Sequence, residues 1–440
     1  MKRIFVLGGF FSGCFLLAWG VIYAQRQAVQ NLVITNARII DGNGGVIPRG
    51  AVVIRNGRIA SVSAGNASEP GARQLDVRGM TVMPGFIDDH RHVVAPDFPP
   101  GDPVKWMREE AAARMQEFLD GGFTTIQSCG DPPEQIVELQ RRLNAGTIKG
   151  PRLFTAAFVQ LSRPAGAAGP PPVDPARTDT SRPPNRPKVA AGAIPDDETR
   201  AAVRQLKQAG IDVIKTVLTV TPGGPEEHTL TVVIDEAKKQ GLPVFTHAVS
   251  VDDTLVAVRA HPSVLVHTPH IGQLTQEQAR TIAGAGIPMM STLGVFVPTF
   301  AAENQRARSR SGLDNVPRFR DLDPFPMETL SSAGQGPVNA RLLWEAGITY
   351  GYGTDTTFLP KDSLAQELRA LHLVFSAQDI IKILTRNAAT TIGRSKDIGT
   401  LESGKLADLV VIDGDPLASV EDLLKVKTVI KDGQIVVDKR

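Results

Sequence analysis

The stretch PGFIDDHRH, residues 84–92, ends an apolar run with two histidines that lie two positions apart. Side chains at positions i and i+2 of an extended strand point to the same face of that strand. His90 and His92 can therefore bind one metal ion from the end of a strand. Two strand histidines can also simply pack in a core, so the interpretation depends on what the rest of the chain adds.

Seven further apolar runs follow this stretch, and helix-like segments such as residues 196–210 and 229–241 lie between them. The runs are GFTTIQSC (122–129), PRLFTAA (151–157), DVIKTVLTV (212–220), PVFTHAV (243–249), SVLVHTP (263–269), PMMSTLGV (288–295) and TYGYGTD (349–355). Alternation of strands and helices predicts a parallel sheet, and eight such units predict a closed (β/α)8 TIM barrel. We assign residues 81–395 to this barrel.

The two ends of the chain have a different character. Residues 32–80 and 396–440 contain short strand-like runs separated by turn signals such as Asn43-Gly44 and Asp432-Gly433. Two β-rich ends that flank a barrel predict one small β-sandwich domain built from both termini. The fold class expected from the sequence is therefore α/β, a TIM barrel with a composite β-sandwich.

Four more polar residues fall at the ends of later strand-like runs, namely Lys215, His247, His267 and Asp355. Active sites of such barrels lie at the carboxyl ends of the strands, so we expect these residues to meet the first two histidines. Imidazole and carboxylate suit zinc and similar ions. A lysine cannot bind a cation as an ammonium group, but burial lowers its pKa and a neutral amine can add carbon dioxide. The resulting carbamate can bridge two metals, whereas an isolated lysine here would be a core-edge residue with its ammonium group in water.

With these residues and several longer motifs, the chain resembles the metal-dependent amidohydrolases, in the subgroup of imidazolonepropionase-like proteins and zinc-dependent Xaa-Pro dipeptidases. The resemblance spans residues 32–440, and its last motif is long and specific. Besides the opening stretch, the similar motifs are GGFTTIQ (121–127), GPRLF (150–154), DVIKT (212–216), FTHA (245–248), LVHT (265–268), GTD (353–355), TRNAATTIGR (385–394) and IGTLESGKLADLVVIDGDPL (398–417).

The resemblance implies a site with two metals, zinc by default, although Mn, Co or Fe fit the same donors. The first two histidines and Asp355 would hold one ion, the later two histidines would hold the other, and carbamylated Lys215 (N6-carboxylysine) would bridge both together with a hydroxide. The hydroxide would attack an amide, a cyclic amide or a dipeptide, with Asp355 passing its proton to the leaving nitrogen. The implied metal ligands are His90, His92, Lys215, His247, His267 and Asp355.

Two rival interpretations stay open. A mononuclear enzyme similar to imidazolonepropionases or deaminases would need no carbamate at Lys215. A metal-binding but inactive scaffold is disfavoured, because it has no need of the complete ligand set. The chain also departs from relatives, with Val266-His267-Thr268 where Glu-His-Gly is common and Gln127-Ser128 where Arg-Asp is common. These departures leave the substrate open rather than the class of chemistry.

The first residues indicate export. Lys2 and Arg3 precede an apolar segment that ends at Ala24, which is typical of a secretory signal covering residues 1–24. We expect a periplasmic or secreted protein, and an uncleaved membrane anchor is the alternative because the apolar segment is long. Once the signal and its Cys14 are removed, Cys129 alone remains, which excludes an internal disulfide.

Charge excludes another class of partner. Without Lys2 and Arg3, the 48 basic residues become 46, equal to the 46 acidic residues, so no basic surface for nucleic acid is expected. The expected partner is a small-molecule amide or dipeptide, and the resemblance makes a homo-oligomer possible.

Two segments interrupt the strand and helix pattern. Residues 163–195, rich in Pro, Gly and Ala, are either a lid or a plain insertion. The Arg-rich residues 303–326 either contact substrate or form a solvated loop.

Overall fold

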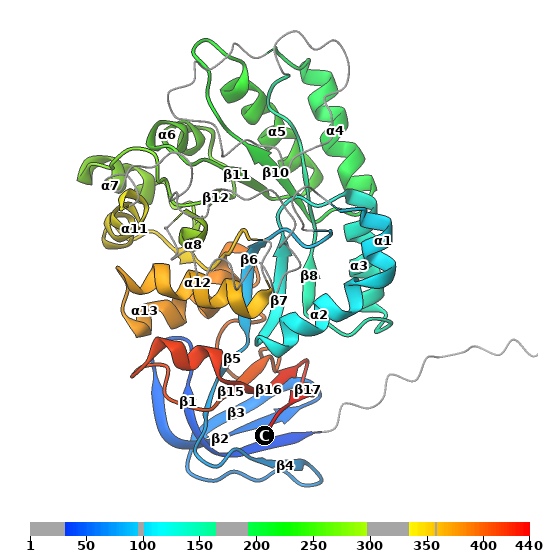
Figure 1. Cartoon of the computed structure of the whole chain (residues 1–440), viewed down its shortest axis with the longest axis vertical. Helices are drawn as coiled ribbons and strands as arrows, with labels where there is room; N and C mark the ends of the chain where they lie inside the picture. Colours follow the sequence, from blue (N-terminus) through cyan, green and yellow to red (C-terminus); the bar gives the residue numbers. More distant parts are fainter. Residues whose placement is uncertain (1–30, 96–100, 164–191, 297–333, 357–358) are drawn as a thin grey trace, which may run out of the picture.

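The computed structural model describes residues 31–95, 101–163, 192–296, 334–356 and 359–440. A β-rich part formed by both ends of the chain lies below a larger part in which strands are surrounded by helices (Figure 1). Within the described ranges, no helix combines the length and apolar character needed to cross a bilayer. The expected signal segment, the possible lid and the Arg-rich segment fall wholly or mostly outside these residues, so export of the chain stays a prediction.

Each of the eight apolar runs contains a barrel strand, and every pairing between these strands is parallel. The third run is split at Thr155 into two short strands, one pairing with each neighbour. The strands are β6 (Phe86–Arg91), β7 (Phe123–Ser128), β8 (Arg152–Phe154), β9 (Ala156–Phe158), β10 (Val213–Val217), β11 (Val244–His247), β12 (Val264–Val266), β13 (Met289–Met290) and β14 (Tyr350–Gly351).

The barrel closes where its last strand meets its first. The backbone N–H of Asp89 donates to the carbonyl of Tyr352 at 2.8 Å, and the N–H of Asp355 donates to the carbonyl of His90 at 2.9 Å. A Cβ atom at Gly353 would lie 2.7 Å from the Cβ of His90, so glycine is needed for this close approach. The closure places the end of the GYGTD run directly against the end of the opening stretch.

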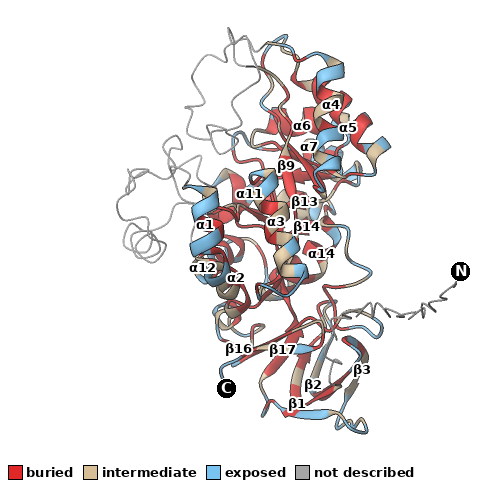
Figure 2. Cartoon of the chain, turned by 90° about the vertical axis from the view of Figure 1, so that its right-hand side faces the viewer, coloured by how far each residue is buried: buried red, intermediate tan, exposed pale blue. Residues whose placement is uncertain are grey.

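Helices cover the outside of the barrel and turn their buried faces toward its strands (Figure 2). Local signals explain several limits, such as the capping box of Thr275 and Gln278 and the left-handed Gly241 that ends α5. Helices expected at 196–210 and 229–241 are confirmed as α4 and α5. The helices are α1 (Pro103–Glu109), α2 (Ala111–Asp120), α3 (Pro133–Asn144), α4 (Asp196–Gln208), α5 (Glu226–Gln240), α6 (Val251–Ala260), α7 (Gln276–Gly284), α8 (Leu293–Phe296), α11 (Gln335–Glu345), α12 (Pro360–His372), α13 (Ala377–Lys382), η2 (Ile383–Asn387) and α14 (Ala388–Thr391).

Strands from both termini share one sheet with the order β17-β16-β15-β5-β1-β2-β3, and β4 pairs with β1 beside this path. Residues 81–84, assigned to the barrel from the sequence, form β5 of this sheet, where they pair with β1 and β15. A 3-10 helix, η3 (Val420–Leu424), precedes β16. The predicted fold class, a TIM barrel with a β-sandwich, is confirmed. The strands are β1 (Leu32–Ile40), β2 (Val46–Arg55), β3 (Arg58–Ala64), β4 (Arg73–Asp76), β5 (Thr81–Pro84), β15 (Leu409–Ile412), β16 (Val426–Lys431) and β17 (Gln434–Asp438).

Strand β15 contributes to two hydrophobic cores at once. Leu409 and Val411 belong to the core of the terminal sheet, whereas Val410 and Ile412 belong to the larger core of the barrel. This division follows from the alternation of side chains along a strand. The barrel therefore rests on the terminal sheet through strands whose two faces are both buried.

The position of β15 predicts the effect of truncating its side chains. Leu409→Ala should lower the free energy of unfolding by about 2–5 kcal/mol, because the side chain is fully buried and leaves a cavity. Leu373→Ala is the matched control, since 62% of Leu373 is exposed, and it should change stability by no more than about 0.5 kcal/mol. Denaturant unfolding of both variants measures the difference, and equal midpoints would contradict the assigned burial of Leu409.

Candidate active site

The two histidines of the opening stretch lie at the carboxyl end of β6. His90 is fully buried within the strand, while His92 follows it and keeps 30% of its side chain exposed. The pairing of β6 with β7 shifts register between Asp88 and Arg91, which marks an irregularity at the site. The two imidazole rings lie 6.0 Å apart between centroids. One strand end thus supplies two adjacent nitrogen donors, as the sequence predicted.

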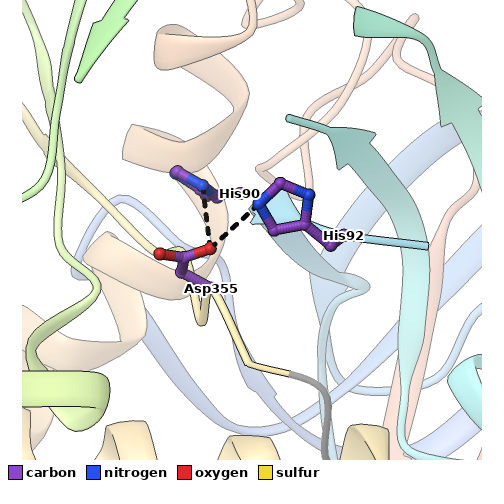
Figure 3. Close-up of side chains that lie close together, drawn as sticks. All are labelled: His90, His92 and Asp355. Atoms are coloured by element: carbon purple, nitrogen blue, oxygen red, sulfur yellow. Dashed lines mark ion pairs between the residues drawn. The ribbon is translucent and has the colours of Figure 1, made fainter. Parts of the chain in front are cut away.

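The carboxylate of Asp355 lies between these two rings (Figure 3). Its Oδ1 atom is 3.2 Å from Nε2 of His90 and 3.3 Å from Nε2 of His92. One ligand atom from each of the three residues falls within 4.8 Å of the others, a spacing that suits one metal ion. Asp355 has a φ of 47°, in the left-handed region, and comes from the loop after β14.

The other two predicted histidine ligands, His267 and His247, extend the site beyond His90. His267 directly follows β12, and its Nε2 is 3.9 Å from Oδ2 of Asp355. Its ring lies 4.8 Å from that of His90 and 4.3 Å from that of His247, the last residue of β11. We call His92, His90, His267 and His247, in that spatial order, the imidazole row. Sequence analysis expected all four to converge, and the structure brings them together.

Lys215 also belongs to the barrel interior, but it lies in the middle of β10 rather than at its end. In the pairing of β10 with β11, Val217 is opposite His247, so Lys215 lies two positions deeper in the barrel. Its side chain is buried, and Nζ has no hydrogen-bond partner among the residues that the structure describes. Burial lowers the pKa of Lys215. A buried amine without a partner is costly as a cation, so this environment fits a neutral or modified side chain.

The protonation of the site suits a cation. Burial lowers the pKa of His90 to about 4, and it holds those of His247 and His267 well below their usual value. Burial by itself would raise the pKa of Asp355, but His90 and its neighbours keep that pKa well below the usual range. His92 differs, because burial opposes its charge but the hydrogen bond and negative charge of Asp355 raise its pKa above the usual value. Three neutral imidazoles and His92 therefore lie around an ionised carboxylate. This donor set fits a divalent metal ion such as zinc.

A second layer of contacts orients His267. Its Nδ1 lies 2.7 Å from the hydroxyl of Thr292, which follows β13. The adjoining backbone is held by Glu367 of α12, which accepts from Ser291 Oγ at 2.6 Å and from the N–H of Leu293 at 3.0 Å. Burial raises the pKa of Glu367 to about 7. Sequence reasoning missed Thr292 and Glu367, and a hydroxyl after the seventh strand was the available signal.

Aromatic rings flank the imidazole row. Phe158 stacks on His92 with a centroid distance of 6.5 Å, and Phe296 meets the ring of His267 edge-on at 5.6 Å and stacks on His270 at 3.7 Å. The stacking of His270 on Phe296 is a packing contact. Cys129 is buried, and burial raises its thiol pKa, so it has the character of a small core residue rather than of a nucleophile.

Comparison with known proteins adds independent findings. The model of the amidohydrolase family matches residues 81–436. Imidazolonepropionase from Geobacillus kaustophilus is 25% identical over 443 residues, covering 90% of this chain and 91% of that protein. A crystal structure of an amidohydrolase superposes with a TM-score of 0.74 at 27% identity, covering 93% of this chain and 99% of the other. A prolidase complexed with N-methylphosphonate-L-proline has a TM-score of 0.73 at 24% identity, covering 93% and 100% of the two chains, and shows the shared fold.

The matched family region contains the whole imidazole row together with Lys215 and Asp355. Ligand atoms of His90, His92 and Asp355 lie within 4.8 Å of one another, which suits the metal dependence of that family. Because the family model covers most of the sequence, the chain belongs to the amidohydrolase family of metal-dependent hydrolases and is an enzyme that acts on carbon–nitrogen bonds.

Proposed function

We propose that this enzyme hydrolyses an amide, a cyclic amide or a dipeptide with two divalent ions held by the imidazole row, Asp355 and Lys215. The observation that carries the proposal is the convergence of three imidazoles on the carboxylate of Asp355, with His247 against the third of them and a buried lysine amine without a hydrogen-bond partner among the described residues. His90, His92 and Asp355 are the ligands of one ion, and the other two imidazoles serve the second. Carbamylated Lys215 is the bridge between them.

Zinc is the metal that this set of nitrogen and oxygen donors favours, although Mn, Co and Fe accept the same donors. A divalent ion bound there lowers the pKa of water towards about 7 and polarises a carbonyl group. The neutral state of His90, His247 and His267 leaves their ring nitrogens free of the extra proton that would block coordination. Three of the four imidazoles in the row are thus held in the protonation state that metal binding requires, whereas the carboxylate of Asp355 raises the pKa of His92 against the effect of burial.

Asp355 is the residue that moves a proton. Its low pKa keeps it ionised, and its two oxygens are directed to different imidazoles, Oδ1 towards His90 and His92 and Oδ2 towards His267. An ionised carboxylate at this point accepts a proton from the attacking water and returns it to the departing nitrogen. Phe158 and Phe296 provide apolar walls that limit access of bulk water to the row.

The substrate is proposed only as a class. Similarity to imidazolonepropionases along most of the chain supports a cyclic amide, and the expectation from sequence motifs also includes Xaa-Pro dipeptides. The chain departs from relatives at Gln127 and Ser128, the last residues of β7, and at Val266 and Thr268, which flank His267 of the imidazole row. Both substrate groups therefore belong in the first activity screen.

A mononuclear enzyme is the second candidate, because one observation favours it. The donors of His90, His92 and Asp355 form a compact group by themselves, without Lys215 or the other two histidines. In that case the Lys215 side chain stays an amine and supports the site by its position alone.

Replacing Lys215 separates the two candidates. If Lys215 bridges two ions, Lys215→Ala should lower metal content from about two ions per chain and lower hydrolytic activity with it. His228→Ala is the control, since His228 lies on the exposed surface of α5 and pairs with Asp196. Elemental analysis gives the metal content, and a carbonyl signal after labelling with 13C-bicarbonate reports the carbamate. About one ion per chain in both wild type and Lys215→Ala would favour the mononuclear enzyme.

Asp355→Asn tests the proton transfer. The amide keeps an oxygen for the metal but accepts a proton poorly, so most of the metal should remain while kcat falls about 10²–10⁴-fold. The measurement is kcat on a substrate found in a panel of dipeptides, N-acyl amino acids and cyclic amides, with metal content determined on the same sample. Full activity in this variant would show that Asp355 does not have the proposed role.

A further inference from the structure

We propose that Arg91 is a positioning residue for Asp355, because its buried guanidinium binds the hydroxyl groups of the two threonines that flank this aspartate. This inference deepens the proposed function and rests on the metal-binding role of Asp355. Arg91 stands between His90 and His92 in the sequence, yet it has no ligand function there. The opening stretch would then supply both the histidines and the group that holds their carboxylate partner in place.

One nitrogen of Arg91 makes the contacts that carry the inference. Nη1 lies 3.0 Å from Thr354 Oγ1, 3.1 Å from Thr356 Oγ1 and 2.7 Å from Ser363 Oγ in α12. The guanidinium carbon lies 5.4 Å from the centroid of the Phe118 ring, and only 1% of Arg91 is exposed. A threonine on each side of Asp355 is therefore tied to the same buried cation.

The neighbours of Thr354 fix the direction of these hydrogen bonds. A guanidinium group only donates, so the hydroxyl of Thr354 accepts from Arg91. The same hydroxyl donates to Oδ2 of Asp88 at 2.7 Å, and the N–H of Thr354 lies 3.2 Å from Asp88 Oδ1. The carboxylate of Asp88 thus joins the arginine through Thr354 and also compensates its buried charge. Charge-assisted hydrogen bonds of this kind are shorter and stronger than neutral ones.

Asp355 needs such support because of its backbone. A left-handed φ of 47° costs a residue with a side chain about 1–3 kcal/mol, and it persists where the surroundings determine it from several directions. The N–H of Asp355 is bound to the carbonyl of His90, which fixes one point of the loop. Arg91 fixes the residue before and the residue after. Together these contacts hold the carboxylate at the position where its Oδ1 meets both histidines.

An arginine that only stabilised the fold would have a different signature. Replacing such an arginine would lower stability, because the buried carboxylate of Asp88 would lose its compensating charge, but it would leave metal affinity unchanged. A positioning role instead predicts a change in metal affinity, since residues that orient metal ligands change affinity about 10–100-fold when they are replaced. Metal affinity and stability are therefore the two quantities to compare.

The experiment uses the full chain and two arginine variants. Arg91→Met should weaken zinc affinity about 10–100-fold in competition with a chromophoric chelator, and it should change the absorption bands of bound Co²⁺. Arg152→Met is the matched control, because Arg152 is also largely buried and paired with Asp408, but at the other end of the barrel beside the terminal sheet. That control should lower thermal stability and leave zinc affinity and the Co²⁺ bands unchanged.

Two more variants keep the test decisive if Arg91→Met does not fold. Thr356→Val keeps the shape of the side chain and removes only the hydroxyl beside Asp355, so zinc affinity should fall in the same direction. Arg91→Lys keeps the charge without the planar fork and should recover part of the affinity. In the double variant, the losses from Arg91→Met and Thr356→Val should be less than additive, because both remove the same contact.

The outcomes separate this role from the proposed function. Wild-type zinc affinity and Co²⁺ bands in both Arg91→Met and Thr356→Val would overturn the role of Arg91 alone. If the wild-type chain bound no zinc, or if Asp355→Ala left the Co²⁺ bands unchanged, the proposed metal site and the role of Arg91 would fall together.

Discussion

The closure of the barrel is the constraint on which the site depends. Three backbone hydrogen bonds, one from Asp89 to Tyr352 and two from Thr354 and Asp355 to His90, join the segment that follows the last barrel strand to the first strand. They bring a carboxylate from late in the sequence onto two histidines from its beginning. Gly351 and Gly353 have no Cβ atom that would clash with Asp89 and His90, so the two ends of the barrel can approach this closely. Without this joint, the imidazole row would lack the carboxylate that three of its rings contact.

Side chains of β6 point in different directions and contact several elements around this closure. His90 faces the interior and Asp355, Asp89 accepts a 2.6 Å hydrogen bond from Thr391 of α14, and Arg91 reaches Ser363 of α12. A single short strand thereby attaches two helices of the outer layer to the wall of the site. The charges that it buries are each placed against a polar partner, which is the condition for tolerating them in a core.

Periodicity and residue type were enough to predict the eight strands, the two helices named in advance and the meeting of His90, His92 and Asp355. The depth of Lys215 was not predictable, because the ends of short strands are poorly marked by sequence and β10 extends past it. The contacts of Arg91 and Glu367 were missed for another reason. Their partners lie more than 70 positions away, and a sequence shows such residues without showing which of them meet. The left-handed backbones of His267 and Asp355 likewise arise from tertiary contacts.

The shared strand β15 has a consequence for biosynthesis. Pro84 of β5 pairs with Leu409 of β15. Strand β5 is therefore synthesised early, whereas the strand with which it pairs is synthesised almost last. Until residues 409–412 have been synthesised, the terminal sheet keeps an unpaired edge and both cores lack one wall. Contacts so distant in sequence form slowly and late. The chain therefore completes its fold only after translation has almost ended. A truncated product that stops before Leu409 exposes an unpaired strand edge, which can pair with other chains and lead to aggregation.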